Sequence, residues 1–159
     1  MTAREDLSAT HPAMLVATLG GVGLLPKAPG TFGSLVALPF AWLVARAAGP
    51  AGLLAAAAVL FAAGWWAAAI VARRLGHDPQ IVVVDEAAGQ FLTLVAAPLD
   101  LWHFAAGFAL FRLFDITKPW PVGWADRNIH GGFGCMFDDT LAALYAVAVL
   151  LAGGWVLGR

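Results

Sequence analysis

Two pairs of neighbouring acidic residues stand out in a chain that carries few charges. Charged residues make up 12% of the 159 residues and hydrophobic residues 61%, yet Asp85 and Glu86 are adjacent within the apolar stretch IVVVDEAAGQF. Asp138 and Asp139 likewise precede the apolar stretch TLAALYAV. Like charges and a low dielectric both disfavour ionised carboxylates, so four such groups near one another need a compensating cation. Mg²⁺ suits this place because it prefers oxygen ligands together with retained water and substrate phosphate.

Basic residues suited to a phosphate occur in the stretch FRLFDITKPWP. Arg112 and Asp115 are three residues apart and therefore share one face of a helix. Lys118 follows just before Pro119, where the helix should end. Arginine presents a planar fork to phosphate oxygens, and lysine presents a point charge. A buried ion pair between Arg112 and Asp115 is the structural alternative, and the second cation nearby favours an anion site.

A loop rich in glycine and proline, LLPKAPGTFGS, offers further groups for binding an anion. It carries Lys27 and the hydroxyl groups of Thr31 and Ser34. Its prolines prevent a continued helix, and backbone N–H groups in such a turn can bind an anion. Loops of this composition are common between membrane segments. The loop indicates an anion site only together with the acids and cations predicted near it.

The composition predicts a membrane protein that forms a single domain over residues 1–159. Residues 1–12 form a polar tail that lacks the basic start and apolar core of a cleaved signal peptide. Prolines, glycines and charges divide the rest into apolar segments at about residues 34–48, 51–72, 87–97, 101–114 and 140–157. About 20 apolar residues cross a bilayer, so we expect roughly three to five spans.

Following these segments back and forth across a membrane places the acid pairs, Arg112, Asp115 and Lys118 on one side. The same side holds six of the mapped basic residues and the opposite side two: Lys27, Arg73, Arg74, Arg112, Lys118 and Arg127 against Arg46 and Arg159. The side richer in lysine and arginine faces the cytoplasm in membrane proteins. We therefore expect a multi-pass protein whose site opens to the cytoplasm.

Helix capping is the structural alternative for each acid pair. Aspartate before an apolar run is a favoured N-cap, and acids stabilise the first turn of a helix. Two pairs together with Asp115 on the same predicted side of the membrane favour one shared site over two separate caps.

Three blocks of the sequence, in this order and spacing, resemble the bacterial phosphatidylglycerophosphatase A family: GVGLLPKAPGTFGS, DPQIVVVDEAAGQ and FRLFDITKPWPVGWADRNIHGGFGCMFDDTLAALYA. The pattern FDxxKPxP followed by GGxGxMxDD is the specific part. The resemblance implies an all-α helical membrane protein, a bundle in which a central helix is surrounded by others, in the bacterial inner membrane. It also implies a Mg²⁺-dependent hydrolysis of phosphatidylglycerophosphate to phosphatidylglycerol and inorganic phosphate.

The resemblance, carried over residue by residue, assigns roles to nine positions: Lys27, Thr31, Asp85, Glu86, Arg112, Asp115, Lys118, Asp138 and Asp139. We predict that Mg²⁺ is held by Glu86, Asp138 and Asp139, with Asp85 as a further ligand or a supporting group. Substrate binding is predicted for Lys27, Thr31, Ser34, Arg112 and Lys118, and catalysis for Asp85, Arg112, Asp115 and Lys118. Asp115 could orient water, act as a base or attack phosphorus, and the sequence fits one metal or two. One departure is Ala143, where the family usually has glycine.

Other classes of function make different predictions from the same residues. A transporter or ion channel is the main alternative, because carboxylates inside a membrane usually mark ion pathways. It predicts acids spread across the membrane depth, whereas Asp100 is the only acid at the far end of the predicted bundle. A structural subunit of a larger complex would leave the combination of loops unexplained. The net charge of −1 provides no basic field for nucleic acid, and the sequence does not indicate an oligomeric state.

Overall fold

The computed structural model describes residues 8–76 and 79–156, and over these ranges it contains helices and no strand. The elements are α1 (Pro12–Ala17), the 3₁₀ helix η1 (Val22–Leu24), α2 (Pro29–Leu75), α3 (Val84–Leu94), α4 (Leu101–Thr117), α5 (Val122–Asn128) and α6 (Gly131–Val156). The predicted all-α fold is thereby confirmed. Of the predicted polar tail, residues 1–7 lie outside the described residues, and α1 begins at Pro12 with His11 as its N-cap.

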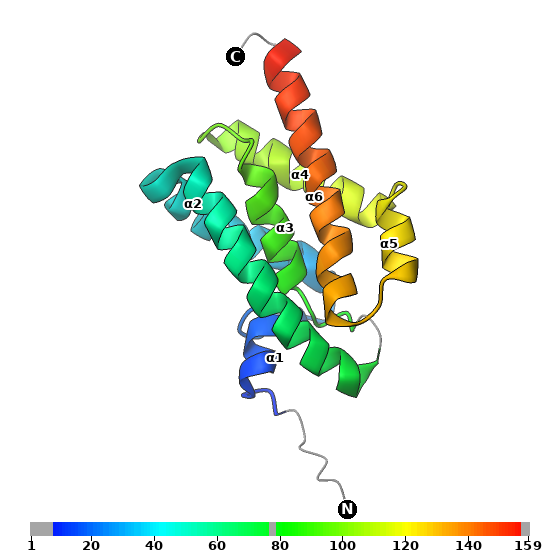
Figure 1. Cartoon of the computed structure of the whole chain (residues 1–159). Helices are drawn as coiled ribbons and strands as arrows, with labels where there is room; N and C mark the ends of the chain where they lie inside the picture. Colours follow the sequence, from blue (N-terminus) through cyan, green and yellow to red (C-terminus); the bar gives the residue numbers. More distant parts are fainter. Residues whose placement is uncertain (1–7, 77–78, 157–159) are drawn as a thin grey trace, which may run out of the picture.

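The short helix α3 is the centre of the bundle. It packs against α2, α4 and α6, and Figure 1 shows it between the long helices α2 and α6. Nine of its eleven residues are buried. Its composition fits this position, since its small and apolar residues face neighbours on every side. The implied arrangement of a central helix surrounded by others is confirmed.

Helix α2 consists of two arms that meet at a sharp break. Gly49 has a φ of 61° and a ψ of −159° there, a conformation that glycine adopts without steric cost. Pro50 follows, and its missing N–H is harmless because the first residues of a helix have no intrahelical acceptor. Figure 1 shows the chain reversing at this point. The break confirms the predicted separation of segments 34–48 and 51–72.

Helix α6 begins much earlier than predicted. It starts at Gly131 and not near Thr140, so Asp138 and Asp139 lie about two turns inside the helix. The buried side chains of Cys135 and Met136 hold this first part of α6 against a core cluster that includes Ala67 and Ala68 of α2. The interpretation of this acid pair as a helix cap is therefore wrong.

Among the described residues, α2 and α6 are long and apolar enough to cross a membrane. The other predicted segments appear as the short central helix α3 and as α4, whose N-cap Asp100 accepts a hydrogen bond from the His103 N–H at 3.0 Å. Helix α5 was not predicted, because its seven residues follow a Pro-Trp-Pro sequence and carry no long apolar pattern. It packs on α6.

Candidate active site

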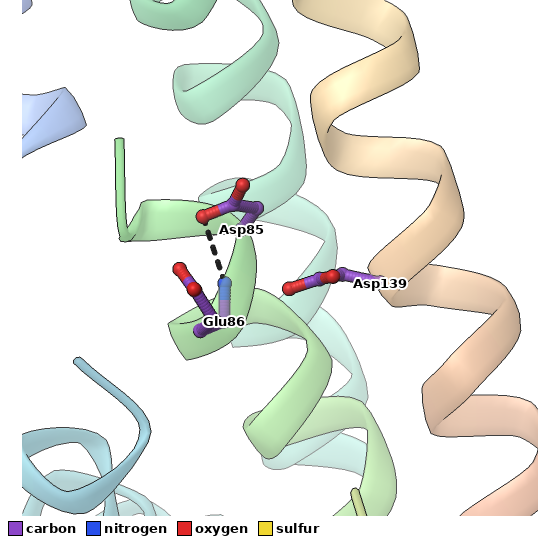
Figure 2. A group of neighbouring side chains, drawn as sticks. All are labelled: Asp85, Glu86 and Asp139. Atoms are coloured by element: carbon purple, nitrogen blue, oxygen red, sulfur yellow. Dashed lines mark hydrogen bonds between the residues drawn. The ribbon is translucent and has the colours of Figure 1, made fainter. Parts of the chain in front are cut away.

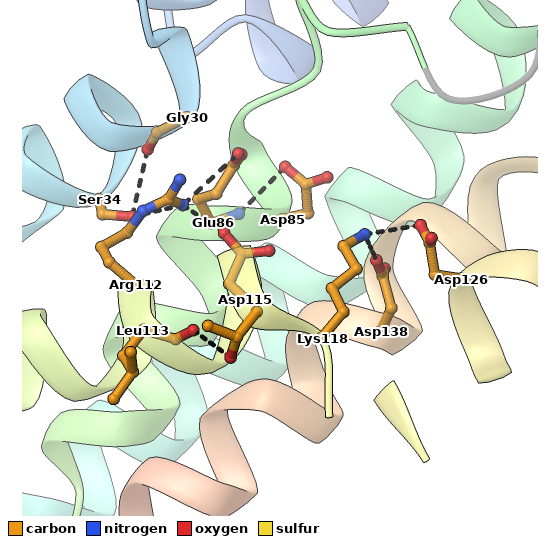
Figure 3. A network of polar contacts seen from close by, with 11 residues as sticks. Gly30, Ser34, Asp85, Glu86, Arg112, Leu113, Asp115, Lys118, Asp126 and Asp138 are labelled. Atoms are coloured by element: carbon orange, nitrogen blue, oxygen red, sulfur yellow. Dashed lines mark hydrogen bonds and ion pairs between the residues drawn. The ribbon is translucent and has the colours of Figure 1, made fainter. Parts of the chain in front are cut away.

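A cavity of about 400 Å³ lies between the N-terminal ends of α2 and α3, the C-terminal end of α4 and the first half of α6. Eight of the predicted site residues line it: Thr31, Asp85, Glu86, Arg112, Asp115, Lys118, Asp138 and Asp139. Figure 3 shows most of these side chains converging from separate helices. Segments far apart in the sequence thus supply one polar cavity in an otherwise apolar bundle.

Three of the acids form a compact group. Carboxylate oxygens of Asp85, Glu86 and Asp139 lie within 4.8 Å of one another, and Figure 2 shows the Asp139 side chain reaching from α6 toward the start of α3. Asp85 and Glu86 belong to the first turn of α3, where the helix dipole favours negative charge. The Asp85 Oδ1 atom accepts a hydrogen bond from the Glu86 N–H at 3.0 Å.

This group fits a divalent cation. The Oε2 atom of Glu86 and the Oδ2 atom of Asp139 are buried and have no hydrogen-bond partner. Burial raises the pKa of Asp85 well above its usual value, and the neighbouring Glu86 and Asp139 raise it further. A hard cation with oxygen ligands would satisfy the unpaired oxygens and remove the repulsion between the carboxylates.

Arg112 occupies the side of the cavity next to this acid group. Its Nη1 atom lies 2.6 Å from Asp115 Oδ2 and 3.8 Å from Glu86 Oε1. It also donates a long hydrogen bond of 3.5 Å to the Ser34 Oγ atom, which is fully buried on α2. The ion pair expected as the structural alternative is therefore present. Arg112 and Asp115 both line the cavity, so this ion pair belongs to the site.

Lys118 provides a second cation at the end of α4. It is the C-cap residue of the helix and has a left-handed backbone, so its side chain turns toward α5 and α6. Its Nζ atom donates hydrogen bonds to Asp126 Oδ1 at 2.6 Å and to Asp138 Oδ2 at 2.7 Å. Burial alone would lower the pKa of Lys118, but the two carboxylates raise it above its ordinary value. Lys118 is therefore a permanent positive charge at the cavity.

Comparison with known proteins adds an independent observation. The family model of phosphatidylglycerophosphatase A matches residues 15–153. The chain belongs to the phosphatidylglycerophosphatase A family. It is therefore a phosphatase, and neither a transporter nor a structural subunit is supported.

The relatives cover nearly the whole chain. The phosphatidylglycerophosphatase A of Escherichia coli strain K12 is 40% identical over 160 residues, which cover 98% of this chain and 92% of the relative. That of Haemophilus influenzae is 39% identical over 150 residues, covering 93% and 92%. A Bacteroides thetaiotaomicron protein, provisionally named a phosphatidylinositol-3-phosphatase, is 41% identical over 153 residues, covering 91% and 95%. No solved structure matches the chain.

The structure of this phosphatidylglycerophosphatase A family member separates the predicted site residues into groups. Asp85, Glu86 and Asp139 form the group suited to a metal, whereas Asp138 contacts Lys118. Lys27 is exposed and is not among the residues that line the cavity. The metal-binding role of Asp138 and the substrate-binding role of Lys27 stay predictions.

Sequence reasoning missed Asp126 as a member of the site. Asp126 belongs to α5 and shares the Lys118 ammonium group with Asp138. Recognising WADRN as a short helix after the Pro-Trp-Pro turn would have placed this acid near Lys118. Ala143, where the family usually has glycine, is fully buried beside Phe111 and Val122 in a core cluster, so its methyl group contributes to helix packing.

Gly30 was predicted to lie in a loop, but α2 begins at Pro29 and includes it. It lies in the first turn of α2 and lines the cavity. A methyl group there would overlap the Glu86 carboxylate and lie 3.4 Å from an Arg112 Nη atom. The absent side chain is thus what allows Glu86 to lie beside Arg112.

Proposed function

We propose that this phosphatase hydrolyses phosphatidylglycerophosphate to phosphatidylglycerol and inorganic phosphate with the help of Mg²⁺. The observation that carries the proposal is a single cavity lined both by a three-carboxylate group and by two cations, Arg112 and Lys118. The names of the E. coli and H. influenzae relatives support the lipid substrate. Water attacks phosphorus and the phosphorus–oxygen ester bond breaks, so the lipid keeps the ester oxygen, which takes a proton and becomes a hydroxyl group, and inorganic phosphate is released.

Asp85, Glu86 and Asp139 are the residues that would hold the cation. Once bound, Mg²⁺ would neutralise these carboxylates and polarise a phosphoryl oxygen. Glu86 suits this role because its Oε2 atom has no protein partner. The same holds for the Oδ2 atom of Asp139. Asp138 would support the site from the Lys118 side.

The cations would bind the remaining phosphate oxygens. Arg112 offers a donor fork at the cavity wall, and Lys118 adds a charge that Asp126 and Asp138 hold in place. Thr31 lines the same cavity, and its hydroxyl group would donate a further hydrogen bond. Asp115 lines the cavity while it pairs with Arg112, and we propose that it orients the attacking water.

A membrane setting fits the outer surface of the bundle. Large apolar side chains point outward from both arms of α2 and from α6, among them Phe40, Val59 and Leu151, each more than half exposed. Such side chains are stable against lipid and unfavourable in water. The excess of lysine and arginine on the site side supports a bacterial inner-membrane protein whose site faces the cytoplasm.

An apolar groove next to the site suits the acyl chains of a lipid. The groove has a volume of about 290 Å³ and is lined by residues of α2, α3 and α6, including Ala58, Ala88, Leu92 and Thr140. Thr140 follows Asp139 of the acid group directly in the sequence. Ala88 and Leu92 follow Asp85 by three and seven residues, so they lie on its side of α3. A lipid whose phosphate occupies the cavity could therefore place an acyl chain here.

Phosphate release from purified protein tests the proposal. We expect release from phosphatidylglycerophosphate in mixed micelles, its loss on extensive chelation and its return with Mg²⁺. Phosphatidylinositol 3-phosphate serves as the comparison substrate because of the B. thetaiotaomicron relative. Full activity in excess chelator after dialysis would contradict the metal, and preferential hydrolysis of the inositol lipid would contradict the substrate.

Filling the groove should affect the lipid substrate selectively. Ala58 is an exposed residue that lines the groove, so Ala58→Phe should lower the turnover of a long-chain substrate several-fold and spare a short-chain, water-soluble analogue. Ala55 is exposed on the same helix and does not line the groove, which makes Ala55→Phe the matched control. If Ala58→Phe hydrolyses the long-chain substrate as fast as Ala55→Phe does, the acyl chain lies elsewhere.

A further inference from the structure

One fully buried side chain near the site has no role in the proposed chemistry. Gln90 of α3 is 0% exposed, and neither the nitrogen nor the oxygen of its amide has a hydrogen-bond partner. Burying an amide without partners is unfavourable, and a buried leucine or methionine would be more stable here. A polar residue at this position therefore calls for an explanation.

Helix geometry places Gln90 one turn of α3 away from the acid group, toward the C-terminal end of the helix. It follows Glu86 by four residues and thus lies one turn further along the same face of α3. That face packs on α4: Glu86 lies beside Arg112, and the Phe111 ring packs against Gly89. The level of Gln90 is therefore the level of Arg112 and Phe111 on α4.

Two groups of the site have unsatisfied hydrogen-bonding capacity that matches the Gln90 amide. The Nε–H of Arg112 is a buried donor with no acceptor, and the Oε2 atom of Glu86 is a buried acceptor with no donor. A glutamine amide offers one carbonyl acceptor and one NH₂ donor. A single residue on this face can thus serve both groups.

We propose that Gln90 is a positioning residue for the phosphatase reaction. These atoms form no direct hydrogen bond in the structure, so bound water would link the Gln90 carbonyl oxygen to the Arg112 Nε–H and the Gln90 NH₂ group to Glu86 Oε2. The second lone pair of Glu86 Oε2 stays available to a cation. Anchored at Nε as well as by Asp115 and Ser34 at Nη1, the guanidinium group keeps its second Nη group directed at the cavity. The inference rests on the proposed function only in taking Arg112 as a phosphate-binding group.

The substitution Gln90→Met separates positioning from a merely structural role. Methionine keeps much of the volume and removes both hydrogen-bonding groups, so the unfolding temperature in detergent should stay unchanged or rise. The inhibition constant for inorganic phosphate and the KM for the lipid should each rise about tenfold, the usual effect of losing a hydrogen bond to a charged group. The phosphate-induced rise in unfolding temperature should shrink in parallel.

Thr93→Val is the matched control. Thr93 is also fully buried on α3 with an unpartnered hydroxyl group, but its methyl group lies against Gly107 of α4, more than one helical turn from Arg112. Valine keeps its shape. Thr93→Val should leave the inhibition constant for phosphate and the KM at wild-type values.

A double-mutant cycle with Arg112→Lys tests whether Gln90 acts through Arg112. Lysine has no Nε–H, so adding Gln90→Met to Arg112→Lys should change phosphate inhibition little further. An equal loss in both backgrounds would overturn the inference, as would wild-type phosphate inhibition in Gln90→Met alone. A lower unfolding temperature of Gln90→Met would overturn it too, since the amide would then be a structural group.

The measurements also keep this inference distinct from the proposed substrate. Phosphate inhibition and the phosphate-induced thermal shift do not depend on which lipid is hydrolysed. A wild-type protein that responds to phosphate but does not hydrolyse phosphatidylglycerophosphate would contradict the substrate alone. A wild-type protein with no thermal response to phosphate would overturn the role of Gln90.

Discussion

Replacing Asp139 by asparagine should lower phosphate release by at least about a hundredfold while the protein stays folded, since even groups that only support metal ligands typically account for roughly 10- to 100-fold. Asp139 is 5% exposed, lies inside α6 and has an unpartnered Oδ2 atom. The substitution removes a charge from a crowded acid group, so the unfolding temperature in detergent should not fall. Phosphate release per amount of folded protein is the measurement.

A second site variant and a control accompany this substitution. Glu86→Gln removes a second charge of the same group and should behave like Asp139→Asn. Asp100→Asn is the control, because Asp100 caps the start of α4, roughly 25 Å along the helix from Lys118, and asparagine caps a helix as well as aspartate does. Wild-type turnover in both site variants would remove the acid group from the mechanism.

Gly30→Ala should lower activity on the order of a hundredfold, because a misplacement of about 1 Å in a catalytic group can have that effect. The added methyl group overlaps the Glu86 carboxylate, which is the mobile end of a side chain. The helix can therefore form, and the carboxylate must move away from Arg112. Folded yield and unfolding temperature measure whether the helix forms, and phosphate release measures the effect of the displaced carboxylate.

The control for Gly30→Ala is Gly153→Ala near the end of α6. An added methyl group at Gly153 meets no atom within 4 Å, so activity should be unchanged and the helix slightly more stable. Wild-type turnover in Gly30→Ala would mean that the position of Glu86 beside Arg112 is not required.

Local patterns predicted the parts of the fold that depend on neighbouring residues. Gly49 and Pro50 interrupt an apolar run, and the structure breaks α2 there. The three-residue spacing of Arg112 and Asp115 predicted a shared helical face, and the two side chains form an ion pair. Both features follow from backbone geometry that a few adjacent residues determine.

Other features depend on contacts between distant segments. The glycines at the start of α6 are poor helix formers and indicated a turn, but packing of Met136 against α2 stabilises a helix there. The acid pairs suggested Glu86, Asp138 and Asp139 as metal ligands, with Asp85 as a further ligand or a supporting group. Successive residues on a helix point about 100° apart, so Asp139 joins the acids of α3 and Asp138 turns to Lys118.

Asp138 contacts Lys118 and Asp139 joins the acids of α3, so an insertion or deletion in α6 near these residues should disrupt both contacts. Met136, packed in the core with residues of α2, fixes the rotation of α6 about its own axis. One residue added between Met136 and Asp138 would turn both carboxylates by about 100° and withdraw each from its partners. The side chains of α6 that face outward can vary freely, but the number of residues between its core contact and its acids cannot. The acid group of α3 and the Lys118 contact both depend on this residue spacing within α6.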